Sequence, residues 1–75
     1  MQKKIVVATS EAPAAVGPYS QAIKTPGLVF TAGQLGLDPA SGEFAGADVA
    51  AQTHQAMENL RAVLKEAGSG LEHIV

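Results

Sequence analysis

The sequence contains no cysteine and no tryptophan, and its aromatic residues are one tyrosine and two phenylalanines. Without cysteine no disulfide can stabilise the chain, and its two histidines cannot supply the four ligands of a structural zinc site. A chain of 75 residues buries only about 60% of the surface that it exposes when unfolded. We therefore expect oligomerisation to supply the missing stability.

Excess positive charge and long apolar runs are also absent. Five basic residues stand against seven acidic ones, so the chain lacks the dense cationic surface that a phosphate backbone requires, and nucleic acid is disfavoured as a partner. The apolar run at residues 5–8 is far shorter than the core of a signal peptide or a membrane span. With no cysteine, a reducing cytoplasmic setting without membrane contact is expected.

The first half of the sequence predicts short strands separated by turns. Residues 5–8 are mostly β-branched and are expected to form an edge or first strand, followed by a loop rich in proline. Residues 19–24 are compatible with a second strand, and Pro26 and Gly27 fit the central positions of a type II turn. Residues 28–34 carry apolar groups on both faces, which indicates a central strand covered on both sides.

A long helix is the clearest element, and it follows a turn expected at residues 38–43. Asp48 suits the N-cap position and Gly68 the C-terminal stop. One helix face carries an apolar stripe that is expected to cover a sheet: Val49, Thr53, Ala56, Met57, Leu60, Val63, Leu64 and Ala67. The other face carries His54, Glu58, Arg61 and Lys65 and is expected to be solvated.

The sequence reaches Ile74 and Val75 in a pattern typical of a strand that is just beginning. Residues 1–75 are therefore predicted to form a single, partial α+β domain with about three strands, one long helix on one face of the sheet and the start of a fourth strand. Such a small sheet has unpaired edges, through which copies of the chain can exchange strands.

Two positions are candidates for a binding site. Gly17 and Pro18 restrict the backbone before Tyr19 and aim its side chain, which favours a binding role, although a ring packed under the helix with a bonded hydroxyl is the commoner role of a lone tyrosine. Gly33 interrupts a strand, which indicates either a bulge or tight contact, or backbone groups offered to a ligand beside Ala32. The residues alone leave both alternatives open.

Metal and nucleophilic chemistry find little support in the sequence. His54 and Glu58 lie one helical turn apart, but two ligands without a third indicate an exposed helix face rather than a metal site. His73 is interpreted as a strand-edge residue rather than a general base. The spacing of serine, histidine and acidic residues suggests no catalytic triad, and no glycine-rich stretch matches a phosphate loop.

Three segments carry a resemblance to a known family: "APAAVGPYSQAI", "VFTAGQLGLDPASGEF" and "DVAAQTHQAMENLRAVLKEAGSGLEHIV". From about Ser10 to Val75 the chain resembles the N-terminal part of the Rid family of reactive-intermediate deaminases, also called YjgF-like proteins or L-PSP endoribonucleases. The resemblance implies a chorismate-mutase-like α+β fold, in which a mixed sheet carries two helices. It also implies a homotrimer with ligand clefts between its subunits.

The activity that the resemblance implies is hydrolysis of an enamine or imine carboxylate, such as 2-aminoacrylate, to a 2-keto acid and ammonia without a cofactor. By position, Tyr19 would be the cleft tyrosine and Gly33 would hold the substrate through its backbone. Ala32 stands where many family members have serine, which removes one hydrogen bond and leaves the substrate preference open. No residue of the chain is assigned a catalytic role.

The family's remaining half supplies an arginine that clamps the substrate carboxylate and a glutamate that positions water, and this chain contains neither. Arg61 is not a substitute, because the helix pattern places it on the solvated face. The 75 residues alone are therefore expected to be inactive, as the N-terminal portion of a 2-iminobutanoate/2-iminopropanoate deaminase. The alternatives are a non-catalytic oligomeric ligand-binding or interaction module, and an endoribonuclease, which the charge balance fits poorly.

Overall fold

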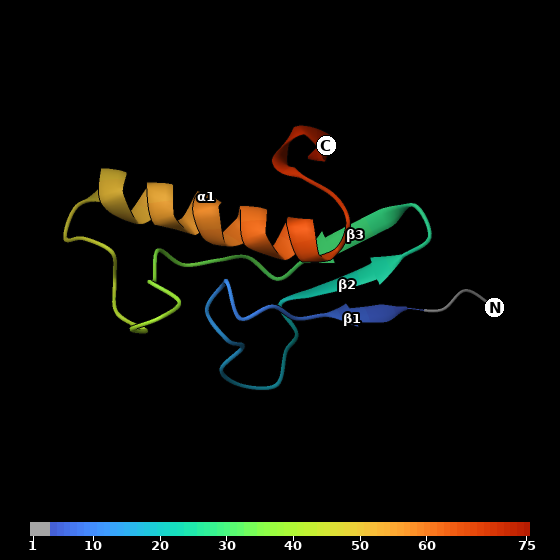
Figure 1. Cartoon of the computed structure of the whole chain (residues 1–75), viewed down its shortest axis with the longest axis horizontal. Helices are drawn as coiled ribbons and strands as arrows, with labels where there is room; N and C mark the ends of the chain where they lie inside the picture. The colour runs from blue at the N-terminus through green and yellow to red at the C-terminus, as the bar shows by residue number, and fades with distance from the viewer. Residues whose placement is uncertain (1–3) are drawn as a thin grey trace.

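Three antiparallel strands form one layer of the molecule and one long helix forms the other, as the computed structural model shows for residues 4–75 (Figure 1). The strands are β1 (Ile5–Val7), β2 (Ala22–Thr25) and β3 (Leu28–Thr31), in the order β1-β2-β3. The helix α1 spans Val49–Glu66 and is followed by a single 3-10 turn, η1, at Leu71–His73. The overall dimensions are 45 × 27 × 15 Å, and the shortest one reflects only two layers.

The hairpin between β2 and β3 forms as the sequence predicts. Gly27 has a φ of 98°, the positive value that the second central position of a type II turn requires after Pro26. The second strand is shorter than expected, since β2 begins at Ala22 instead of Tyr19. The Tyr19 N–H donates to the carbonyl of Gly17 at 2.9 Å, so this segment closes a tight turn before the sheet begins.

The two faces of the sheet have different surroundings. Val7 pairs with Ala22, and both are buried on the face that the helix covers. The adjacent row, Val6, Ile23 and Phe30, faces the other way, because paired residues in an antiparallel sheet share a face and successive residues alternate. Phe30 is 58% exposed. The prediction that β3 is central and covered on both sides is therefore wrong for residues 4–75, where β3 is an edge strand.

Both ends of α1 follow the predicted capping residues. At the N-terminus, the Asp48 carboxylate accepts a hydrogen bond of 2.7 Å from the Ala51 N–H. At the C-terminus, Gly68 has a φ of 83°, and the Ser69 N–H donates to the carbonyl of Leu64 at 2.8 Å. This is the pattern of a Schellman motif, in which glycine lets the chain leave the helix.

The predicted apolar stripe is buried only in its C-terminal half. Val63 and Ala67 pack with Val7 and Ala22 in the core, and Leu64 is 5% exposed. Val49, at the other end of the stripe, is 81% exposed. Each strand has only three or four residues, so the sheet is too short to extend under the whole of α1.

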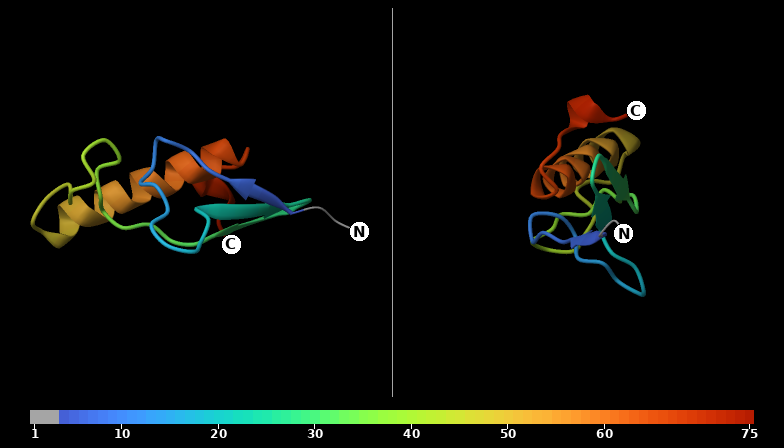
Figure 2. Two further views of the ribbon diagram at one scale, coloured as in Figure 1. Left: turned by 90° about the horizontal axis from the view of Figure 1, so that it is seen from below. Right: turned by 90° about the vertical axis from the view of Figure 1, so that its right-hand side faces the viewer.

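An irregular segment, residues 32–47, lies beneath the N-terminal half of the helix (Figures 1 and 2). Asn59 is 1% exposed and donates to the carbonyls of Leu35 and Leu37 at 2.9 and 2.8 Å. Its oxygen accepts from the Gln55 amide at 2.8 Å. Gly36 of the segment lies directly against the backbone of Gln52. The sequence pattern predicted neither contact, because both depend on the fold.

The prediction that a fourth strand begins at Ile74 and Val75 is wrong. Residues 71–73 form η1, which also corrects the interpretation of His73 as a strand-edge residue, and Ile74 and Val75 pair with no strand among residues 4–75. The Ile74 backbone is extended, but its N–H donates to the carbonyl of Leu71.

Among residues 4–75 the sheet is antiparallel throughout and not mixed, in contrast to the mixed sheet that the resemblance implies. No helix in residues 4–75 combines the length and apolar character needed to cross a bilayer.

Candidate functional site

A groove of about 370 Å³ runs between strand β1 with the loop after it and the segment that leads into β2. We call it the Tyr19 groove, after its only aromatic side chain. Its lining residues are Val6, Val7, Ala8, Thr9, Ser10, Ala14, Ala15, Tyr19, Ser20 and Gln21. None of these side chains carries a charge, but four of them bear a hydroxyl group and one an amide. The groove therefore offers hydrogen bonds to a small ligand and no ionic contact.

Tyr19 is held at the mouth of this groove by its own loop. Gly17 has a φ of 109°, a conformation that favours glycine, and the turn through Pro18 brings the chain back towards the sheet. The ring is 51% exposed, and its hydroxyl accepts a long hydrogen bond of 3.4 Å from the Val16 N–H. The alternative in which the ring packs under the helix is therefore wrong, although the bond to a backbone partner is present.

Gln21 forms the floor of the same region and was missed by sequence reasoning. It is 4% exposed, and its side-chain oxygen accepts from the Thr9 N–H at 2.7 Å. Its side-chain nitrogen donates to the carbonyls of Pro13 at 2.7 Å and Thr9 at 3.1 Å. A glutamine in an alternating polar and apolar stretch gives no signal of burial, because only the fold brings these loop carbonyls around it.

Ala32 and Gly33, the other predicted binding residues, leave β3 at the end of the sheet nearest Tyr19. The Ala32 N–H donates to the carbonyl of Gln21 at 3.1 Å and extends the β2–β3 pairing by one step. Gly33 is exposed with a φ of 95°, and a Cβ placed on it would meet no atom within 4 Å. Tight packing against the helix is thus not the reason for this glycine. Neither residue lines the Tyr19 groove.

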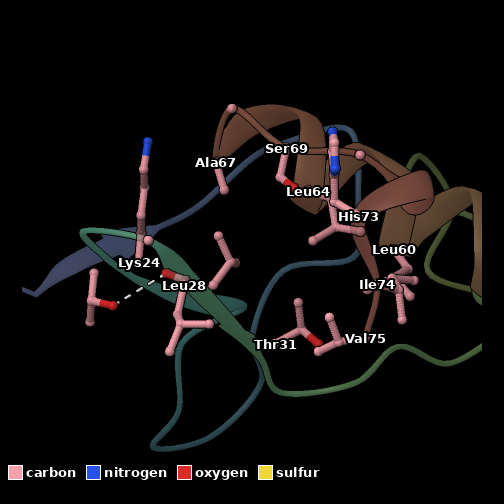
Figure 3. Close-up of a pocket in the computed structure, with 15 residues that line it drawn as sticks. Lys24, Leu28, Thr31, Leu60, Leu64, Ala67, Ser69, His73, Ile74 and Val75 are labelled. Carbon is pink, nitrogen blue, oxygen red and sulfur yellow. Dashed lines mark hydrogen bonds between the residues drawn. The ribbon is translucent and has the colours of Figure 1, made fainter.

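A larger groove of about 600 Å³ lies on the helix side of the β2–β3 hairpin (Figure 3). Leu28 and Thr31 of the hairpin lie on one side, and Leu60 of α1 with Ile74 and Val75 lies on the other. Lys24 and His73 are its ionisable lining residues. Three residues of the edge strand β3 line this groove, and none of the predicted binding residues does.

The charged face of the helix is solvated, as predicted. Arg61 lies 3.6 Å from Glu58, with its side chain 62% exposed. His54 is also exposed. Across residues 4–75, no group of three histidine or acidic side chains is placed to hold a metal ion.

The chain thus combines a two-layer α+β fold with an uncharged groove that Tyr19 lines. The family model for Endoribonuclease L-PSP matches residues 9–75, and the chain therefore belongs to this family, the one that the Rid/YjgF resemblance indicated. The fold agrees, since a crystal structure of an Entamoeba histolytica protein assigned to endoribonuclease L-PSP superposes with a TM-score of 0.93. It is 51% identical, and the match covers 97% of this chain and 58% of that one.

Several curated relatives have names that state an activity. The chain is 49% identical over 73 residues to the chloroplastic Reactive Intermediate Deaminase A of Arabidopsis thaliana, a match that covers 97% of the chain and 39% of the relative. It is 43% identical over 70 residues to the 2-iminobutanoate/2-iminopropanoate deaminase of Mus musculus, with 93% and 52% covered. The chain thus spans about half the length of these relatives or less.

Proposed function

We propose that this chain is the substrate-contacting N-terminal half of an imine deaminase that removes 2-aminoacrylate-type intermediates. The single observation that carries the proposal is the Tyr19 groove, which is small, uncharged and rich in hydroxyl groups, in a chain that resembles named deaminases. In the proposed reaction, water adds to the carbon of the C=N bond of 2-iminopropanoate, the tautomer of 2-aminoacrylate. The C–N bond then breaks, and ammonia and pyruvate leave.

The residues proposed to contact the substrate are Tyr19, Ala32 and Gly33. The Tyr19 hydroxyl is assigned as a hydrogen-bond donor to the substrate, because its oxygen accepts from Val16 and its proton has no acceptor among residues 4–75. Gly33 offers bare backbone next to open space. Hydrolysis of an imine by water needs these contacts, a clamp for the carboxylate and a group that positions the water, but no redox or group-carrying cofactor, so the proposal includes none.

Assembly into a homotrimer, with the site shared between neighbouring subunits, is part of the proposal. It is supported by the row Val6, Ile23 and Phe30, which leaves one face of the sheet uncovered and apolar. A face of this kind is buried by a second layer in a stable domain. Shared clefts also account for Gly33 facing open space outside the Tyr19 groove. The cytoplasmic setting expected from the lack of cysteine belongs to the same proposal.

Tyr19→Phe is expected to lower kcat/KM for imine hydrolysis by about ten-fold, the effect of losing one hydrogen bond to the substrate. The fold should be unaffected, because the hydroxyl makes only one long, exposed hydrogen bond. The measurement generates 2-aminoacrylate from serine with a pyridoxal-phosphate dehydratase and follows the release of pyruvate, using the natural protein that contains this chain.

Ser69→Ala is the matched control, since it removes a hydroxyl that lines the larger groove. Its kcat/KM is expected to equal that of the parent protein. Equal activity of Tyr19→Phe and the parent would show that the Tyr19 hydroxyl does not contact the substrate. A larger loss of activity for Ser69→Ala would place the site in the larger groove.

Phe30→Asp is expected to reduce the native mass of the protein from an oligomer to a single chain, because a carboxylate in an apolar interface is strongly unfavourable. Phe44→Asp is the control, since Phe44 is exposed to almost the same extent, 57% against 58%, but lies outside the sheet. Native mass spectrometry or light scattering gives the result. An intact oligomer in the Phe30→Asp variant would show that the uncovered sheet face is not the interface.

Ribonuclease activity, which the family description contains, is the weaker candidate. The chain has a net charge of −2, and the lining of the Tyr19 groove has no cation to meet a phosphate. RNA cleavage that survives rigorous purification and disappears in Tyr19→Phe would favour it over imine hydrolysis.

A further inference from the structure

We propose that Gln21 is a positioning residue that sets the distance between the two walls of the Tyr19 groove. Tyr19 and Ser20 form one wall, immediately before Gln21 in the chain. The other wall is the loop that follows β1, including Thr9 and Ala14. The Gln21 side chain forms hydrogen bonds from the first wall to the second. Among residues 4–75, no other side chain makes as many hydrogen bonds to that loop.

The hydrogen bonds of Gln21 specify a glutamine and not simply a polar group. Its oxygen accepts from the Thr9 N–H at 2.7 Å, which requires an acceptor on that side. Its nitrogen donates to the Pro13 and Thr9 carbonyls at 2.7 and 3.1 Å and lies 3.5 Å from the Ala12 carbonyl. Turning the amide over would place oxygen against these carbonyls and nitrogen against an N–H group.

The position of Tyr19 depends on the same contacts. The Tyr19 hydroxyl accepts from Val16, which lies three residues after Pro13 in the loop that Gln21 holds. Releasing Thr9 and Pro13 therefore loosens both the wall opposite the ring and the backbone group that contacts its hydroxyl. Because Gln21 is 4% exposed, it is expected to act on a ligand through this loop and not by touching it from solvent. The catalytic part of this inference rests on the proposed function.

The test compares Gln21→Met with Gln52→Met in the natural protein that contains this chain. Gln52 is a matched control, because its amide also donates to a loop carbonyl, that of Gly46 at 3.0 Å, but far from the Tyr19 groove. At a temperature where both variants are folded, kcat/KM for imine hydrolysis is expected to fall on the order of 10- to 100-fold in Gln21→Met only. Gln21→Glu keeps the oxygen that accepts from the Thr9 N–H and replaces the nitrogen that donates to the loop carbonyls. It is the replacement variant if Gln21→Met does not fold.

A second readout needs no enzymatic activity. The NMR signals of the Tyr19 ring, assigned with Tyr19→Phe, and of the Val16 amide are expected to shift in both Gln21 variants and to stay in place in Gln52→Met. Unchanged Tyr19 and Val16 signals, or equal loss of kcat/KM in the Gln21 and Gln52 variants, would overturn the inference. If the parent protein itself lacks deaminase activity, the proposed function fails, whereas shifted signals still support the positioning role.

Discussion

The 75 residues produced alone are expected to hydrolyse 2-aminoacrylate with a kcat/KM at least about 100-fold below that of a full-length deaminase such as the mouse relative. The proposed substrate carries a carboxylate, and the family resemblance implies that an arginine outside these 75 residues clamps it. A bidentate charged contact contributes roughly 3 kcal/mol or more, which corresponds to a factor on the order of 100. The coupled pyruvate assay measures the difference.

The low activity expected of the 75 residues is also supported by the lack of positive charge around the Tyr19 groove. None of the residues that line the Tyr19 groove is basic. Arg61 lies on the solvated face of α1 beside Glu58, and Lys24 lines the other groove. No cation among residues 4–75 is therefore placed to hold a carboxylate in the Tyr19 groove.

Addition of the C-terminal half of a relative provides the control. Mixing the chain with a separately produced C-terminal half of a close relative is expected to restore part of the activity, since the open β3 edge and the larger groove leave room for more chain. Full activity of the 75 residues by themselves would contradict the need for the arginine. A folded, inactive oligomer that the second half does not restore would instead favour a ligand-binding or interaction module.

Gly36→Ala is expected to lower the free energy of unfolding by about 3 kcal/mol or more, the upper end of the range for overpacking a tight contact. A Cβ on Gly36 would contact the Gln52 carbonyl oxygen and lie 2.7 Å from its Cα, so two backbone segments would have to separate. The same displacement would strain the hydrogen bonds from Asn59 to Leu35 and Leu37. Urea unfolding monitored by circular dichroism gives the value.

Gly42→Ala is the control for loss of a glycine without a collision. Gly42 has a φ of 75° and open space around it, so alanine there is expected to cost only about 1 kcal/mol through backbone strain. If the two variants are equally stable, the close approach of the 32–47 segment to α1 is not a constraint on the fold.

Local signals predicted most of the secondary structure. Asp48 and Gly68 marked the ends of the helix, and Pro26 with Gly27 marked the hairpin turn, because capping and turn geometry depend on neighbouring residues. Errors arose where a partner decides the outcome. The strand expected at Ile74 and Val75 has no neighbour to pair with among residues 4–75, and the apolar stripe from Val49 onward extends past the short sheet.

The candidate site was likewise predicted only where a local signal exists. The restricted turn at Gly17 and Pro18 indicated from the sequence that Tyr19 is rigidly held, and the structure places the ring at the edge of a groove. Gln21 carried no such signal, because its partners lie eight to twelve residues away and meet it only when the loop folds back.

The sequence by itself determined the capped helix and the restricted turn before Tyr19, because both depend on neighbouring residues. It also determined the family and the α+β class, through the order of matching segments across residues 9–75. Only the tertiary structure decided which groove contains Tyr19, that this groove has no charge, and which sheet face stays uncovered. These properties arise where segments distant in the sequence pack together. Burial, hydrogen bonding and steric contact there depend on all of the partners at once.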